Sequence, residues 1–322
     1  MTYNKVTSFL YGHYKVSWQI FDTSKPVFIT FDNRGEAGDH SNRHGWGTTL
    51  FLSKNYNFIS FMTSETCWFL DDDFDICLEY AKNIITASGL KDVIGYSGSM
   101  GAYAALLYRE ELFITRLILF NPITTLDPKI ADWENRFSID KALFMKKNRP
   151  TDSLSGFKHE AVPILIFYDP LCYEDSQHIK RLRSKFLNLK TIHLIGAGHG
   201  TPIYLSRIGL LKELAINLYG RELGAFYSKL KSTRYKQLYY NYMLASPRVK
   251  RSPWMTKVLL TNKVIYTHQN LHEKFSDLAL IIKHEDINLA NKLISRALEL
   301  SPNNNALEKN FQLIQEAKNV QH

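Results

Sequence analysis

The sequence predicts an α/β fold over its first two-thirds and an all-helical region after it. Short apolar runs rich in β-branched and aromatic residues alternate with stretches of helical period up to about residue 220, and then the β-like runs stop. This alternation is typical of a mainly parallel sheet flanked by helices. We therefore expect an α/β domain over residues 1–220 and a basic helical domain over residues 221–322.

The order of elements follows from the apolar runs and their breaks. Phe74, Cys77 and Leu78 recur at helical spacing in a stretch that stops before Gly89, a residue suited to a helix C-terminus. Residues 121–160 are irregular, charged and interrupted by prolines, so we expect an excursion above the sheet that could act as a lid. Strands are expected at 26–31, 57–62, 92–96, 116–120, 163–168 and 191–195, and helices at 73–88, 100–109, 176–187 and 202–219.

The C-terminal region should contain three or more helices, broken near Pro247, Pro253 and Pro302. The apolar positions from Ala290 to Leu300 resemble the second helix of a tetratricopeptide repeat, but the chain lacks a clean repeat period. The alternative is a simple helical appendage.

The net charge of +9 arises from one segment of the chain. No Asp or Glu occurs from Leu223 to His272, whereas nine Lys or Arg residues do, all of them between positions 229 and 263. Clustered cations attract phosphate and carboxylate groups, so segment 229–263 is a candidate site for a carbohydrate polymer or another anionic acceptor. Solvated helix faces explain such a run equally well. No recognition motif for nucleic acid accompanies it, so we do not expect nucleic-acid binding.

Several classes of protein are disfavoured. No apolar run reaches the about 18 residues of a transmembrane helix, and the polar N-terminus lacks the pattern of a secretory signal. We therefore expect no transmembrane segment and a cytoplasmic location. Three scattered cysteines form neither a pair nor a metal-ligand spacing, so we expect no disulfide framework and no metal site.

The strongest motif joins a strand directly to a helix at Ser97-Gly98-Ser99-Met100-Gly101. A nucleophile on so sharp a turn is pushed out of the backbone, and its neighbours two positions away must be small. We choose Ser99 as the nucleophile because the strand then has ordinary length and Met100 opens the helix, where its N–H can face a developing oxyanion. Ser97 remains the alternative.

A serine hydroxyl needs a base, and imidazole titrates in the useful range. His199 lies in a glycine-flanked loop after the strand 191–195, which can carry the ring back over the turn. Its orienting acid should follow the preceding strand, where three carboxylates occur. We place Asp169 first because it stands at the strand end, thirty positions before the histidine, then Asp175, which could instead cap the next helix, and last Glu174.

The second oxyanion donor should come from the loop after an early strand. Backbone N–H groups of Asp32 and Asn33 are the candidates, since they follow the strand 26–31. The same loop carries Arg34, a candidate for binding substrate. Trp68 follows the strand 57–62 and could also line the site, although a place in the core explains it as well.

The turn at Ser99 and the Gly-His loop resemble those of the α/β-hydrolase superfamily over roughly residues 1–220, with serine at position 97 where that pattern usually has glycine. Within it, the Asp32-Asn33-Arg34 loop, Tyr168-Asp169-Pro170 and the helical appendage are similar to bacterial enzymes that act on surface polysaccharides. This resemblance implies a serine-dependent O-acetyltransferase with acetyl-CoA as acyl donor. A carboxylesterase or deacetylase with water as acceptor is the alternative, and an inactive hydrolase-fold binding module is a third.

Overall fold

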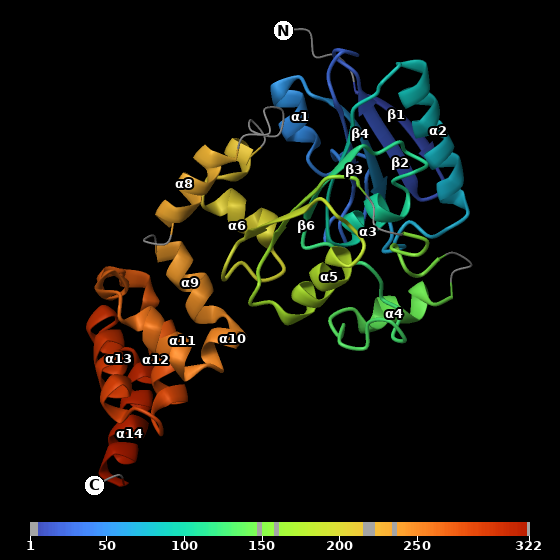
Figure 1. Cartoon of the computed structure of the whole chain (residues 1–322). Helices are drawn as coiled ribbons and strands as arrows, with labels where there is room; N and C mark the ends of the chain where they lie inside the picture. The colour runs from blue at the N-terminus through green and yellow to red at the C-terminus, as the bar shows by residue number, and fades with distance from the viewer. Residues whose placement is uncertain (1–5, 147–149, 158–160, 215–222, 234–236, 321–322) are drawn as a thin grey trace. The chain divides into compact units, whose positions relative to one another are not determined.

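The computed structural model of this chain (Figure 1) describes residues 6–146, 150–157, 161–214, 223–233 and 237–320. The chain divides into two compact units, residues 1–194 with 199–202 and residues 195–198 with 203–322. The expected domain boundary after residue 220 lies outside the described residues.

An eight-stranded sheet forms the first unit, in the order β1-β2-β4-β3-β5-β6-β7-β8. β2 is antiparallel to both of its neighbours, and the strands from β4 to β8 are parallel. This confirms the predicted α/β class. The strands are β1 (Thr7–Tyr11), β2 (Tyr14–Gln19), β3 (Val27–Phe31), β4 (Asn57–Thr63), β5 (Val93–Gly98), β6 (Arg116–Phe120), β7 (Ile164–Tyr168) and β8 (Leu189–His193).

Side-chain alternation along the strands builds an apolar layer on each face of the sheet. On one face, Ile29 and Phe31 of β3 join the main core, onto which α2 (Asp73–Ala87), α3 (Ser99–Leu107) and α5 (Tyr173–Arg183) pack. On the other face, Phe28 stacks on Phe51 of α1 (Thr48–Lys54) with ring centroids 4.8 Å apart. Both faces of the central strands are therefore buried, as expected for a parallel sheet.

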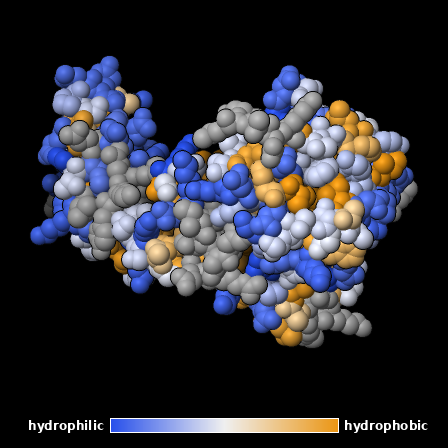
Figure 2. All heavy atoms as spheres, turned by 90° about the horizontal axis from the view of Figure 1, so that it is seen from above, coloured by the Kyte–Doolittle hydropathy of each residue, from blue (hydrophilic) through white to orange (hydrophobic). Residues whose placement is uncertain are grey.

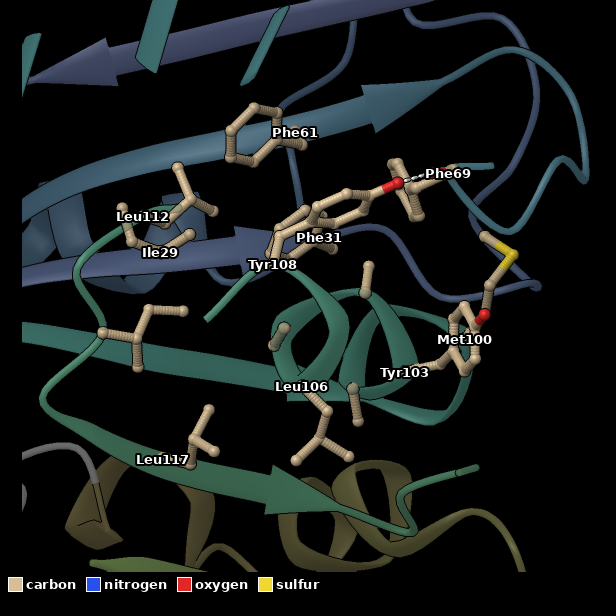
Figure 3. Packing of buried hydrophobic residues seen from close by; sticks show 14 of the residues in the cluster. Ile29, Phe31, Phe61, Phe69, Met100, Tyr103, Leu106, Tyr108, Leu112 and Leu117 are labelled. Atoms are coloured by element: carbon tan, nitrogen blue, oxygen red, sulfur yellow. Dashed lines mark hydrogen bonds between the residues drawn. The ribbon is translucent and has the colours of Figure 1, made fainter. Parts of the chain in front are cut away.

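The helix that follows β5 lies at the centre of this core (Figure 3). Met100, Tyr103 and Leu106 of α3 are buried at 0% exposure. The close-up also shows the Tyr108 ring among Phe31, Phe61 and Phe69, with its hydroxyl donating to the Phe69 carbonyl. α3 is thus held rigidly, which fixes the turn at its first residue.

The structure differs from the sequence expectations at the ends of the sheet. The hairpin of β1 and β2 was not predicted, because β1 is an edge strand with mostly exposed residues and lacks apolar alternation. β8 ends at His193, two residues before the expected strand end. α5 begins at Tyr173 rather than Ser176, so Asp175 lies in its first turn and does not precede it.

The excursion over 121–160 contains one helix, α4 (Ser138–Phe144), and an isolated β-bridge between Thr125 and Asp152. Ile139, Leu143 and Met145 are exposed on and just after α4. Residues 147–149 and 158–160 lie outside the described residues. Whether the excursion acts as a lid stays a prediction.

Helices make up the described part of the second unit, which confirms the predicted helical C-terminal region. Its core gathers apolar side chains of α9, α12, α13 and α14 around Phe275 and Leu293. Pro247 and Pro253 each begin a helix, as proline does at a first helical turn. The elements are α6 (Thr201–Arg207), α8 (Gly224–Ser232), α9 (Gln237–Ala245), α10 (Pro247–Lys250), α11 (Pro253–Leu260), the 3₁₀ turns Lys263–Thr267 and Gln269–Leu271, α12 (His272–Ile282), α13 (Ile287–Leu300) and α14 (Asn305–Val320).

The face of the molecule drawn in Figure 2 is mainly hydrophilic, with apolar side chains gathered in patches among the polar ones. Among the described residues, no helix combines the length and the apolar character that a membrane crossing requires. The tetratricopeptide resemblance stays a prediction.

Candidate active site

The turn between β5 and α3 has the backbone of a nucleophile elbow. Ser99 adopts φ 50°, a left-handed conformation that costs a non-glycine residue about 1–3 kcal/mol. Gly98 before it is extended, and α3 begins at Ser99 itself. Gly101 must lack a side chain, because a Cβ there would lie 2.5 Å from the Phe31 carbonyl oxygen. The strain and the close approach together aim the Ser99 side chain out of the turn.

Ser97 and Ser99 have different environments, which separates the two candidates. Ser97 is fully buried, and its Oγ accepts the backbone N–H of Phe31 at 3.1 Å. It therefore joins β5 to β3 where the regular ladder between them has ended at Ile29 and Gly95. Ser99 is partly exposed, and its Oγ lies 2.8 Å from Nε2 of His199. The geometry favours Ser99 as the reactive hydroxyl.

The loop that carries His199 is held to the sheet by Asn121, a residue that the sequence analysis did not single out. Asn121 stands at the carboxyl end of β6 with φ 44°, and its amide donates to the carbonyl oxygen of His199. Thr201 donates in turn to the Asn121 side-chain oxygen. The histidine backbone is thus fixed from both sides, and its ring keeps 27% exposure.

The carboxylate on the far side of the imidazole is Asp175, because its Oδ1 lies 2.8 Å from Nδ1 of His199. The preference for Asp169 was wrong. Asp169 Oδ1 accepts the N–H of Leu171 and so shapes the turn after β7. Since α5 begins at Tyr173, Asp175 is the third residue of the helix and lies on its buried side. Glu174, the third candidate, interacts with the Cys172 thiol at 3.8 Å.

Burial alone would raise the pKa of Asp175, but the neighbouring His199 and Arg136 outweigh burial and lower it. The carboxylate therefore stays charged beside the imidazole. A charged acceptor at Nδ1 fixes the tautomer that leaves Nε2 free to accept a proton. The three side chains of Ser99, His199 and Asp175 form a continuous relay of the kind used in nucleophilic catalysis.

Arg136 is a fourth member of this site that sequence reasoning missed. It comes from the excursion over 121–160, and its NH1 lies 2.7 Å from Asp175 Oδ1 and 3.0 Å from His199 Nδ1. The same guanidinium pairs with Glu134 through Nε at 3.0 Å and NH2 at 2.5 Å. Arginine and imidazole thus share one oxygen of Asp175.

Behind Arg136 the polar network continues through groups that are fully buried. His178 accepts the N–H of Thr124 at Nδ1, so its proton is on Nε2, which lies 3.2 Å from Glu134 Oε2. Burial lowers the pKa of His178, and the ring stays neutral. Burial would raise the pKa of Glu134, but the hydrogen bonds from Arg136 and His178 outweigh it and lower the pKa to about 2. The network therefore holds two carboxylates against one guanidinium.

The three candidate oxyanion donors differ in the partner that each backbone N–H has. Met100 is the second residue of α3, so its N–H has no intrahelical partner and remains available. The N–H of Asn33 interacts with the Glu36 carboxylate, and its loop follows directly from Phe31, against which Gly101 packs. The prediction that Asp32 supplies an oxyanion donor is wrong, because its N–H donates to the Phe61 carbonyl at 2.9 Å and continues the sheet.

The Asp32 side chain has a structural role instead. It is fully buried and receives two bonds from Arg43, at 3.1 and 2.5 Å, and the N–H of Thr63 at 3.0 Å. Burial raises the pKa of Asp32 despite these partners. The carboxylate anchors the loop that carries Asn33.

Arg34 and Trp68 meet at one residue of the excursion. Arg34 Nε donates to Asp140 Oδ2 at 2.8 Å, and the Trp68 indole N–H lies 3.3 Å from the same oxygen. Trp68 is 1% exposed and packs edge-on against Phe144, so it belongs to the core rather than to an open substrate surface. The expectation that Trp68 contacts substrate is therefore not met here, whereas the Arg34 side chain keeps 46% exposure.

In the basic segment 229–263, three described lysines pair with carboxylates outside the segment. Lys229 contacts Glu213 at 2.8 Å, and Lys250 contacts Asp277 at 3.2 Å. Lys257 contacts Asp286 at 3.1 Å. Part of the positive charge is thus neutralised within the second unit. Residues 234–236, with two of the nine cations, lie outside the described residues.

No protein-family model matches this chain, and neither does any curated protein sequence. Several solved structures are similar. The capsule O-acetyltransferase of Neisseria meningitidis serogroup A is 15% identical, with 68% of this chain and 97% of that chain covered and a TM-score of 0.44. An esterase of Pyrococcus furiosus is 16% identical, covering 68% of this chain and 92% of its own, with a TM-score of 0.46.

A third similar structure, the α/β hydrolase enzyme MGS-M2 from a Medee basin deep-sea metagenome library, is 15% identical, with 66% of this chain and 97% of that chain covered and a TM-score of 0.46. Two features of this chain identify its fold. One is the order of the strands in the sheet, with an antiparallel second strand, and the other is the strained serine between β5 and α3. With this order and this turn, the chain has the α/β-hydrolase fold.

Proposed function

We propose that this chain is a serine-dependent acyl-transfer enzyme that forms an acyl ester on Ser99. The observation that carries the proposal is the continuous contact from Ser99 Oγ through His199 to Asp175, with 2.8 Å at each step. The inactive binding module has no need of such an arrangement, nor of a strained residue at its centre.

The first half-reaction follows from the geometry. His199 Nε2 accepts the Oγ proton while Oγ attacks the acyl carbonyl carbon, and the carbonyl electron pair moves to its oxygen. The N–H groups of Met100 and Asn33 would stabilise this oxyanion, an interaction worth about 3–4 kcal/mol for a single donor in other enzymes. When the tetrahedral adduct collapses, the leaving group departs with the proton held by His199, and the acyl ester remains.

The second half-reaction uses the same groups in reverse. His199 removes a proton from the acceptor hydroxyl, which attacks the acyl-Ser99 carbonyl. The bond to Oγ breaks and the serine regains a proton from the imidazolium. Asp175 holds the ring in position throughout and stabilises its cationic form. Arg136 keeps that carboxylate charged and in place.

Acetyl-CoA is our proposed donor, and a hydroxyl of a polysaccharide is our proposed acceptor. Support comes from the sequence resemblance of the Asp32-Asn33-Arg34 loop to enzymes acting on surface polysaccharides, and from the basic segment 229–263, which suits phosphate or carboxylate groups. A cytoplasmic location belongs to this proposal, because acetyl-CoA is available there.

A carboxylesterase with water as the acceptor is the second candidate. It uses the same residues, and the 27% exposure of the His199 side chain leaves the base accessible to water. The two functions differ in the molecule that accepts the acyl group. Formation of the acyl ester on Ser99 is common to both.

Steady-state release of coenzyme A thiol from acetyl-CoA separates the candidates. We expect release to be stimulated by an acceptor polysaccharide and lost in Ser99→Ala, with Ser53→Ala, an exposed serine on α1, as matched control. Rapid turnover of simple aryl esters, together with thiol release that no polysaccharide stimulates, would instead support the esterase. Thiol release that persists unchanged in Ser99→Ala would remove both.

A further inference from the structure

The turn between β1 and β2 and the loop after β4 bring together three metal-ligating side chains, none of which belongs to the proposed relay. The ligand atoms of His13, Cys67 and Asp71 all lie within 4.8 Å of one another, and in the described part of the chain they form the single such group of nitrogen, sulfur and oxygen donors. His13 is 54 positions from the cysteine, so the spacing of the cysteines alone did not predict a metal site.

The contacts within the group are those of converging donors. His13 Nε2 lies 3.1 Å from Asp71 Oδ2, yet this contact lacks the alignment of a hydrogen bond, and the buried nitrogen has no other partner among the described residues. The Tyr14 hydroxyl lies 3.0 Å from the same Asp71 oxygen and 3.1 Å from Cys67 Sγ. Metal–ligand bonds of about 2.0–2.3 Å place adjacent ligands of a tetrahedral zinc ion roughly 3.3–3.8 Å apart, which is close to the 3.1 Å between the His13 and Asp71 atoms.

The backbone between two of these residues is strained. Trp68 and Phe69, between Cys67 and Asp71, both have left-handed conformations, with φ 57° and 58°. Such conformations are unfavourable for large side chains and persist where the surroundings impose them. Burial of both rings contributes, and a metal ion bound at both ends of this short segment would hold the same conformation.

We propose that His13, Cys67 and Asp71 bind one zinc ion. Imidazole nitrogen, thiolate sulfur and carboxylate oxygen are the three donor types that zinc takes in proteins. On binding, the Cys67 thiol releases its proton to solvent and the sulfur forms the bond to the metal. The fourth position is left for water, and the Tyr14 hydroxyl is placed to donate to a ligand oxygen or sulfur. The His13 and Asp71 side chains are 20% and 18% exposed, which leaves a route for the ion.

An ion bound here would connect two segments of the first unit. It would tie the β1–β2 hairpin to the loop that carries Trp68, whose indole contacts Asp140 of the excursion. The site lies in the same unit as Ser99 but shares no residue with the proposed relay, so it stands whether or not the acyl chemistry is correct.

Metal titration of the full-length chain tests the proposal. After removal of metals by chelator dialysis, we expect one equivalent of Zn²⁺ to bind and to raise the thermal midpoint of unfolding. Co²⁺ in its place should give thiolate-to-metal charge-transfer absorption, a band that reports the sulfur ligand directly. Cys67→Ala should abolish the band and weaken Zn²⁺ binding at least about tenfold.

Matched variants keep the test informative. Cys77→Ala removes a buried thiol on α2 and should retain both the band and the affinity, whereas Asp71→Asn should weaken binding while a circular dichroism spectrum shows the fold intact. A wild-type chain that binds neither ion at stoichiometric concentration overturns the proposal. So does an equal charge-transfer band in the Cys67→Ala and Cys77→Ala variants.

Discussion

Replacing Arg136 by Met should shift the acid limb of the activity profile to higher pH. The guanidinium lies 2.7 Å from the Asp175 oxygen and 3.0 Å from His199 Nδ1. Without this cation, burial of Asp175 is less opposed, and the pKa of its carboxyl group rises. A higher pH is then required to produce the charged carboxylate that orients His199.

The magnitude follows from the distances. A unit charge pair at 2.7 Å interacts by about 6 kcal/mol at an effective dielectric constant of 20. An opposite charge this close typically moves a carboxyl pKa by about 1–3 units, so we expect the acid limb of kcat/KM to move up by at least about one unit. Removing one partner of a buried pair also costs about 3–5 kcal/mol of folding free energy, because the buried carboxylates of Glu134 and Asp175 then lose the cation that both contact.

The assay is the pH dependence of kcat/KM for cleavage of the acetyl-CoA thioester or for aryl ester hydrolysis, with urea unfolding measured on the same variants. Arg136→Lys keeps the charge but cannot bridge both carboxylates, so it should give a smaller shift. Arg116→Met, which removes an ion pair with Asp92 at the start of β6, serves as control and should leave the limb in place. An unchanged acid limb in Arg136→Met, despite lost stability, would show that the Arg136 guanidinium does not keep the Asp175 carboxylate charged.

Four further variants test the assignments at the site. Asp175→Asn should lower kcat by about 10⁴-fold, whereas Asp169→Asn should lose only about 1 kcal/mol of stability with its turn hydrogen bond; comparable kcat losses would contradict the assignment of Asp175 as the orienting acid. Ser97→Ala leaves the Phe31 N–H unpaired, so urea unfolding should show a loss of about 1–3 kcal/mol while acylation persists. Glu134 has a depressed pKa of about 2, so its contribution to stability is present above about pH 4.5 and is lost as the pH falls toward 2. Glu134→Gln should therefore differ from the wild type by roughly 3 kcal/mol near neutral pH and much less below pH 3 in acid unfolding.

The fold could be predicted because local patterns determine it. Buried parallel strands such as 27–31 and 116–120 are continuous apolar runs, and the strand–turn–helix at Ser99 requires small residues that the sequence displays. The edge strand β1 was missed because exposure on both faces removes the alternation on which such a prediction depends.

The orienting acid could not be chosen from sequence, because the choice depends on where α5 begins. Starting at Tyr173, the helix turns Asp175 toward the core, and a start three residues later would have left it as a cap. The role of Arg136 could not be predicted from sequence for another reason. It lies in an irregular segment whose path is set by tertiary contacts, and no periodicity marks it.

Intact mass spectrometry of the chain after incubation with acetyl-CoA is the most direct test of whether Ser99 carries the acyl group. We expect a mass increase of one acetyl group that maps to the peptide containing Ser99, is retained in Ser53→Ala and is absent from Ser99→Ala. An adduct that survives in Ser99→Ala, or a chain that takes up no acyl group from either acetyl-CoA or an activated ester, would contradict it.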